Sequence, residues 1–229
     1  MDKQYLSCTA INNQNLAVYV AKKLTSTILT SFRLYIDGKF SLLLKPVSRS
    51  ESNSALIYNL NLPSGFSFIP GNRYEVLTPH NFFVPINISF LARTKKFEEK
   101  YRYDGELGAI YSKKKTVFRV FSPFAASRSL ILYFKGKWKS FVREKDSEHG
   151  IFEISLDGNY DKAGYLYEAE IFGSRYRVVD PYAFALSSNS RLGYVIDRNK
   201  IKAIPSNRDK LPKFENETHA VIYEAHVRD

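Results

Sequence analysis

Hydrophobic and polar residues alternate along the first 95 positions in short runs that are separated by turn residues, and no segment of helical period interrupts them. The clearest unit is a hairpin, in which runs 31–35 and 40–44 flank Asp37-Gly38, a dipeptide that favours a tight two-residue turn. Further strands are predicted over residues 55–60, 66–69, 74–77 and 82–92. Strands at this spacing predict a β-sandwich domain over residues 1–96.

A second series of strand-like runs follows a charged segment, residues 93–103, which is the best candidate for an interdomain connection. Run 115–121 alternates, with Phe118 and Val120 on one side of the expected strand and Arg119 on the other. Further strands are predicted over 130–134, 151–156 and 164–172. The fold class is therefore all-β, with two tandem immunoglobulin-like β-sandwich domains at 1–96 and 97–187 and an irregular C-terminal connector over 188–229.

The net charge does not indicate an additional function. The chain has 229 residues, with 34 Lys and Arg against 23 Asp and Glu, a net charge of +11. Up to Phe97 there are 11 basic and 4 acidic residues (+7), and beyond it 23 and 19 (+4), so the excess comes from few acids rather than from a basic tract. Nucleic-acid binders concentrate their charge on one face, and we expect no nucleic-acid partner.

Cysteine and hydropathy patterns point to the compartment. Cys8 is the single cysteine, so no intramolecular disulfide can form. The N-terminus lacks the apolar stretch of a secretory signal. No run approaches the ~20 apolar residues that cross a bilayer. We expect a cytoplasmic protein with no membrane partner.

Motifs for metal or cofactor chemistry are missing from the sequence. The four histidines show no short metal-ligand spacing, and the single cysteine is far from them. Neither a phosphate-binding loop nor a G-x-S-x-G nucleophile elbow occurs. We expect no metal, no other cofactor and no catalytic residue.

One pair of carboxylates needs a separate argument. Glu168 and Glu170 are two residues apart on a predicted strand, about 6–7 Å from each other, which falls between the separations in retaining and inverting glycosidases. In the alternative, Tyr165, Tyr167 and Ala169 form the buried face and both carboxylates lie in solvent. An exposed carboxyl lacks the desolvation that a catalytic acid needs, so we favour the alternative.

The single tryptophan, Trp138, lies in the run Lys135-Gly136-Lys137-Trp138-Lys139. Aromatic rings stack on flat apolar partners, including sugar faces, and lysines can donate to hydroxyls. Alternatively, Trp138 packs on a neighbouring strand. Composition alone favours this packing role.

Several motifs occur together, in order, over residues 97–229. The run YDGELG at 103–108, KTVFRVFSPFA at 115–125, GYLY at 164–167, VDPYA at 179–183 and IYEAHVRD at 222–229 resemble those of type I pullulanases. These are α-1,6-glucan debranching enzymes of glycoside hydrolase family 13, in the α-amylase superfamily. The middle three motifs are similar to those of their family 48 carbohydrate-binding module, and the last is similar to their first catalytic-barrel strand. Residues 1–96 match only loosely.

The resemblance implies a non-catalytic accessory region. In this family the catalytic carboxylates lie on later barrel strands, so the chain would hydrolyse nothing alone, and its partner would be the barrel that is absent after Asp229. It would support the barrel and contact α-glucan (pullulan, glycogen or maltodextrin) weakly. The alternative is a free-standing glycogen- or starch-binding regulatory module, for which a barrel strand at 222–229 would have no use.

The resemblance also implies candidate carbohydrate-binding residues. Trp138 falls where glycogen-binding family 48 modules have their first Trp, and Tyr176 lies near the position of their second. Lys139 adjoins Trp138 and supplies a hydrogen-bond donor. Glu168 departs from the pattern, because it stands where these modules have a binding Lys. The candidate site is thus Trp138, Lys139 and Tyr176.

Overall fold

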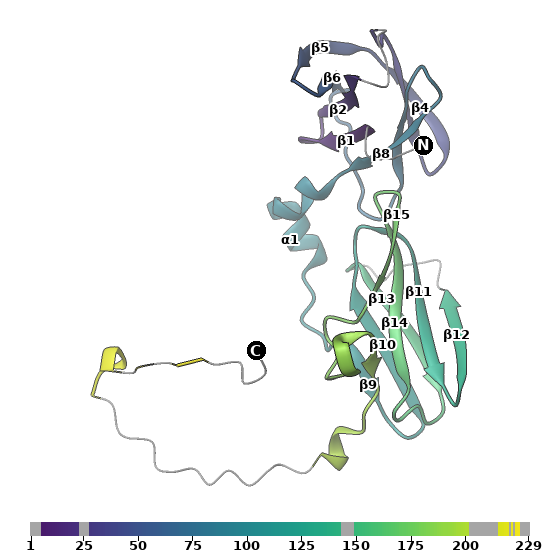
Figure 1. The fold of residues 1–229 in the computed structure, drawn as a ribbon, viewed down its shortest axis with the longest axis vertical. Helices are drawn as coiled ribbons and strands as arrows, with labels where there is room; N and C mark the ends of the chain where they lie inside the picture. The colour runs from purple at the N-terminus through teal and green to yellow at the C-terminus, as the bar shows by residue number, and fades with distance from the viewer. Residues whose placement is uncertain are drawn as a thin grey trace. The chain divides into compact units, whose positions relative to one another are not determined.

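The computed structural model describes residues 6–22, 28–142, 149–201, 215–219, 221 and 223–224. The chain divides into two compact units, Met1–Asp197 and Arg198–Asp229, and the strands found among the described residues belong to the first (Figure 1). The tail strand expected at 222–229 lies outside the described residues, apart from two positions. The domain boundaries at 96 and 187 remain predictions.

In the N-terminal module, over the described residues 6–22 and 28–93, eight strands are hydrogen-bonded in the order β4-β3-β7-β8-β1-β2-β6-β5. A parallel pair, with Cys8 opposite Ile86, joins the two halves of this sheet. The strands are β1 (Leu6–Ala10), β2 (Asn15–Ala21), β3 (Phe32–Ile36), β4 (Lys39–Leu44), β5 (Pro46–Glu51), β6 (Ala55–Asn61), β7 (Tyr74–Leu77) and β8 (Phe83–Asn87).

The two halves of this sheet face each other across one hydrophobic core. Phe32 of β3 and Tyr58 of β6 are both fully buried, with ring centroids 5.5 Å apart. Alternate residues of each half, such as Leu34 on β3 and Leu60 on β6, join the same core. The strand period of two therefore closes a sandwich, as the pattern predicts.

The expected hairpin is confirmed: Asp37 (φ 49°) and Gly38 (φ 76°) form the tight turn between β3 and β4. The strand expected at 66–69 is wrong. Its amides bond to side chains, with Phe68 N–H donating to Asn13 and Ile69 N–H donating to the Tyr74 hydroxyl at 2.9 Å. The apolar run packs its rings on Tyr74 without joining a sheet.

The expected connection contains the helix α1 (Lys95–Tyr101), which follows a 3₁₀ turn at Ser89–Arg93. Thr94 caps α1, because its side chain accepts a hydrogen bond from Phe97 N–H. The strand predicted over 82–92 consequently ends at Asn87. Further 3₁₀ turns span Ser188–Ser190, Arg198–Lys200 and Glu217–His219. In the part of the chain that the structure describes, no helix is long and apolar enough to cross a membrane.

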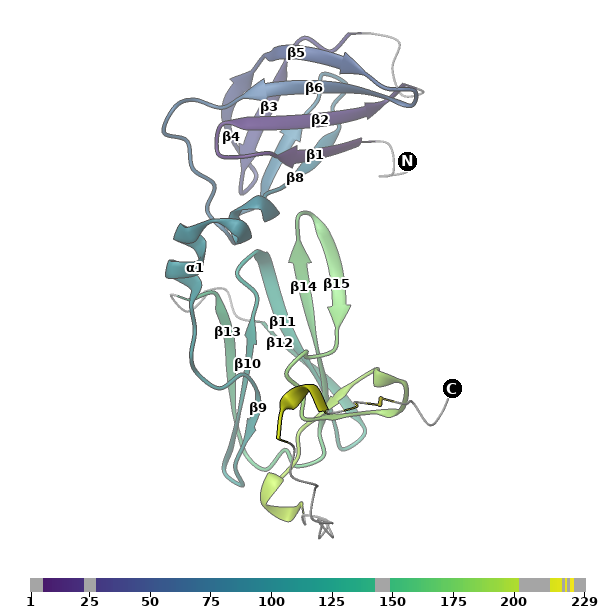
Figure 2. The same cartoon turned by 90° about the vertical axis from the view of Figure 1, so that its left-hand side faces the viewer.

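The second module, residues 108–197, is also a sandwich (Figure 2). One sheet has the order β13-β10-β9, and the other has the order β12-β11-β14-β17-β16 with β15 also paired to β14. Phe118 of β10 and Tyr165 of β14 meet in its core with ring centroids 5.0 Å apart. The strands are β9 (Gly108–Tyr111), β10 (Lys115–Phe121), β11 (Ala125–Phe134), β12 (Lys137–Val142), β13 (Ile151–Asp157), β14 (Gly164–Ile171), β15 (Ser174–Val178), β16 (Ala185–Leu186) and β17 (Gly193–Tyr194).

Candidate functional site

Trp138 lies on β12, at the edge of the larger sheet, and 57% of its surface is exposed. The register places it opposite Tyr133 of β11, and the two rings are 4.9 Å apart at 42°. Tyr133 is itself 38% exposed. Trp138 therefore packs against a neighbouring strand, as the packing interpretation predicts. More than half of its surface is still exposed, as stacking on a sugar requires.

Sequence reasoning missed Tyr133, although a signal for it exists. Lys135 (φ 51°) and Gly136 (φ 75°) form a tight two-residue turn between β11 and β12. Such a turn fixes the register of the strands that flank it, and it pairs residue 134 with 137 and residue 133 with 138. A Lys-Gly turn three residues before the single Trp thus predicts its ring partner.

The three candidate binding residues do not share one face. On adjacent paired strands, residues directly opposite each other point to the same side. Lys139 is opposite Leu132, which is buried in the core, so Lys139 and Trp138 point to opposite sides of β12. Tyr176 is opposite Ala169, also on the core side. A carbohydrate-binding role for Trp138, Lys139 and Tyr176 remains a prediction.

The outward face that carries Trp138 and Tyr133 continues across β14 to β15. Glu168 of β14 points outward there and accepts a hydrogen bond from Arg177 Nε of β15 at 2.9 Å. Four residues separate Gly164, which is opposite Tyr133, from Glu168, a distance of about 14 Å along the strand. The face thus has an aromatic end and a charged end.

The expectation that Glu170 lies in solvent is wrong. Glu170 is 7% exposed and forms an ion pair with Arg73 of the N-terminal module at 2.5 Å. The end of β14 extends beyond its own sandwich, so the strand face that would be open in an isolated module is covered by the other module. Glu168 and Glu170 are thus each paired to an arginine, one on the neighbouring strand and one in the N-terminal module.

Asp180, in the VDPYA motif, lies beneath this sheet and is 3% exposed. It accepts hydrogen bonds from the Tyr165 hydroxyl at 2.8 Å and from Tyr182 N–H at 2.9 Å. Burial raises the pKa of Asp180 above its ordinary value, and the two donors oppose that rise. Burial likewise raises the pKa values of Tyr165 and Tyr167, with Asp180 adding to the effect. Tyr165, Tyr167 and Asp180 are thus buried motif residues that contribute to the fold.

Comparisons with known proteins agree with this geometry. Residues 106–183 match the family model "Carbohydrate-binding module 48 (Isoamylase N-terminal domain)". A Bacillus subtilis pullulanase is 31% identical over 144 residues, which are 63% of this chain, and pullulanase A of Streptococcus pneumoniae is 29% identical over an alignment that covers 90% of it. The chain spans only 20% and 18% of these two relatives.

A solved structure extends the likeness to the N-terminal module. The crystal structure of a pullulanase complexed with maltotriose, from Anoxybacillus sp. LM18-11, superposes with a TM-score of 0.73 at 27% identity. The superposition covers 99% of this chain and 32% of that protein. Residues 106–183 thus carry the signature of the carbohydrate-binding module 48 family, and the chain as a whole is similar to the N-terminal region of type I pullulanases.

Proposed function

We propose that this chain is the non-catalytic N-terminal accessory part of a pullulanase-type α-1,6-glucan debranching hydrolase of family 13, in the cytoplasm, and that it contacts α-glucan through the Trp138 face. The exposed Trp138–Tyr133 ring pair, on a module that matches a carbohydrate-binding family, is the observation that carries the proposal. The proposed partner is the catalytic barrel that the resemblance implies, which would lie in the longer part of the relatives that has no counterpart in this chain.

The physical case rests on stacking. An aromatic ring contributes about 0.5–1.5 kcal/mol beyond its buried area when it stacks on a flat partner, and apolar sugar faces offer such a partner. Tyr133 holds Trp138 from one side, so little ordering of the indole is needed when a sugar binds. Glu168 and Arg177 supply an acceptor and donors for sugar hydroxyls at the other end of the face.

Fluorescence tests this proposal directly, because Trp138 is the only tryptophan. Titration with maltoheptaose should change the emission of Trp138 in a saturable way. Trp138→Ala should weaken binding, followed by calorimetry, at least about fivefold, as expected for one lost stacking ring. The matched control is Tyr19→Ala, which removes an exposed ring on β2 of the N-terminal module and should leave the affinity unchanged.

Stability measurements separate this role from a core role. Trp138→Ala should lower the free energy of unfolding by less than about 1 kcal/mol, against about 3–5 kcal/mol for a buried tryptophan. Unchanged emission together with equal heats for wild type and Trp138→Ala would contradict the proposed contact. Release of reducing sugar from pullulan by the purified chain would contradict the non-catalytic assignment.

A further inference from the structure

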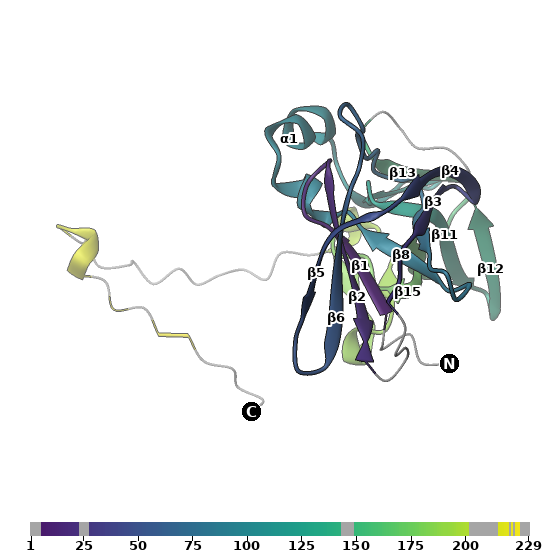
Figure 3. The ribbon, with the colours of Figure 1, turned by 90° about the horizontal axis from the view of Figure 1, so that it is seen from above.

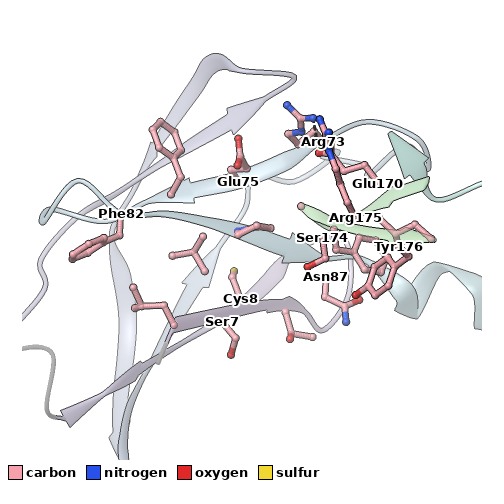
Figure 4. A pocket seen from close by; sticks show the side chains of 18 residues that line it. Ser7, Cys8, Arg73, Glu75, Phe82, Asn87, Glu170, Ser174, Arg175 and Tyr176 are labelled. Carbon is pink, nitrogen blue, oxygen red and sulfur yellow. Dashed lines mark ion pairs between the residues drawn. The ribbon is translucent and has the colours of Figure 1, made fainter. Parts of the chain in front are cut away.

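A cavity of about 660 Å³ lies where the β14–β15 hairpin of the second module meets β1, β7 and β8 of the N-terminal module (Figure 4). Figure 3 shows β1, β8 and β15 from above. Its volume is within the range of about 300–1,000 Å³ that is typical of ligand sites. Tyr176, separated from Trp138 by the strand register, is one of its lining residues. Tyr176 therefore belongs to this cavity and not to the outward face that carries Trp138.

Close contacts fix the hairpin against β8 and so fix the shape of the cavity. The tip is a tight turn of Phe172 (φ 48°) and Gly173 (φ 71°). A Cβ atom on Gly173 would lie 2.4 Å from Pro85 Cγ, so only glycine permits this approach. Phe172 packs against the N-terminal core, and Glu170 pairs with Arg73 beside it. The two modules thus form the cavity walls together.

The charges around the cavity balance. Two guanidinium groups, of Arg73 and Arg175, meet two carboxylates, of Glu75 and Glu170, and one pair of these is already neutralised by its ion pair. An anion would need an excess of positive charge. The balance favours a neutral ligand with many hydroxyl groups, which uses both donors and acceptors.

Aromatic rings complete the lining. Phe83 is 52% exposed and is held edge-on by Tyr35, with ring centroids 5.1 Å apart. Tyr176 is 49% exposed. Figure 4 shows Arg73, Glu170, Arg175, Ser174, Asn87 and Tyr176 gathered at one end of the cavity and Phe82 at the opposite end. Arg175, on β15, is also a lining residue and is exposed, so its guanidinium group is accessible to a ligand.

We propose that this cavity is a composite carbohydrate site, built by both modules, that takes a short neutral segment of α-glucan. The ligand class rests on the proposed function. Tyr176 stacks on a sugar ring, the exposed Arg175 guanidinium donates to a hydroxyl, and the Glu75 carboxylate accepts from one. A ligand held in this way contacts both modules and stabilises their interface.

The site is separate from the Trp138 face, so each can be followed by its own signal. Emission of the single tryptophan reports the outward face of β12. The amide resonances of Gly173 and Ser174, at the hairpin tip, report the cavity in ¹H–¹⁵N spectra of the full chain. Titration with maltotetraose is expected to shift both amides in a saturable way, in the wild type and equally in Trp138→Ala.

Variants in the cavity sharpen the test. Tyr176→Ala should weaken the maltotetraose affinity read from the Gly173 amide about 5- to 10-fold, as loss of one stacking ring predicts. Glu75→Gln is the second variant, and it should weaken the same affinity without removing a packed ring. Tyr19→Ala is the matched control, because its exposed ring lies outside the cavity lining.

The outcomes distinguish the two proposals. Shifts confined to residues around 133–138, or shifts of Gly173 that Trp138→Ala abolishes, would overturn the composite site and leave the proposed function standing. Shifts of Gly173 with constant Trp138 emission would support the composite site and overturn the Trp138 contact. Absence of any response to maltotetraose would overturn both.

Discussion

The two modules bury different kinds of side chain. Among the described residues, the buried polar or charged side chains number one in the N-terminal module, Thr78, whereas the second module buries five. These five are Thr116, Arg128, Glu170, Asp180 and Asp197. Both modules close a sandwich of strands around an apolar core, so the difference concerns what holds the strands in place rather than the architecture.

This difference explains why the second module contains recognisable sequence motifs. Asp180 must accept from Tyr165, and Arg128 donates two hydrogen bonds to the Ser122 carbonyl, so residue identity matters at these positions. An apolar core accepts many combinations of similar volume. The family model accordingly matches residues 106–183, within the second module.

The largest expected effect tests whether the apolar core of the N-terminal module accepts substitutions of similar volume. Leu60 is fully buried on β6. Leu60→Ala should lower the free energy of unfolding by about 2–5 kcal/mol because it leaves a cavity, whereas Leu60→Met, which conserves volume, should cost less than about 1.5 kcal/mol. Urea denaturation followed by circular dichroism measures both. Equal losses would show that the N-terminal core, too, depends on residue identity.

The next effect tests whether the buried polar residues of the second module depend on their specific partners. Asp180→Ala removes the acceptor of the Tyr165 hydroxyl and leaves that hydroxyl buried. A buried group without its partner costs about 1–3 kcal/mol, and the free energy of unfolding should fall by that amount. Asp157→Ala, at an exposed position at the end of β13, is the control and should change stability by less than about 0.5 kcal/mol. A neutral Asp180→Ala would remove the basis of the comparison.

A third, smaller effect concerns the contact between the modules. A double-mutant cycle with Arg73→Ala and Glu170→Ala should give a coupling energy of about 1 kcal/mol, reduced by solvent screening because the Arg73 side chain is 41% exposed. The pair Arg177–Glu168, whose arginine is 71% exposed, is the matched control and should couple more weakly. Coupling no larger than in the control would mean that packing of Phe172, rather than charge, joins the modules.

Structural features that depend only on residues within one strand or turn can be predicted from the sequence. Asp37-Gly38 sets a hairpin, and alternation over 115–121 gives a half-buried strand with Phe118 inside. The sequence does not predict Glu170, whose burial depends on a second module, nor the 66–69 segment, whose amides find distant side-chain partners. The same limit separates Tyr176 from Trp138, because only the pairing of four strands shows that they point to opposite sides.

The smallest effect is a pH dependence at Asp180. Its pKa is raised above the unfolded value of about 3.8, chiefly by burial. The folded protein then keeps this proton to higher pH than the unfolded chain, so raising the pH from below 3.8 through the folded pKa lowers the free energy of unfolding.

Asp180→Asn lacks this titration. The wild type should therefore lose stability relative to Asp180→Asn as the pH rises through that window, and the difference should be constant above it. Urea melts of both proteins between pH 3 and pH 8 provide the measurement, and Asp157→Asn corrects for exposed carboxylates. A wild type that gains on Asp180→Asn with rising pH would show that the hydrogen bonds from Tyr165 and Tyr182 outweigh desolvation. The charged form of the buried carboxylate would then stabilise the fold. The contribution of the polar core of the second module to the free energy of unfolding would increase with pH, whereas that of the apolar N-terminal core would not change.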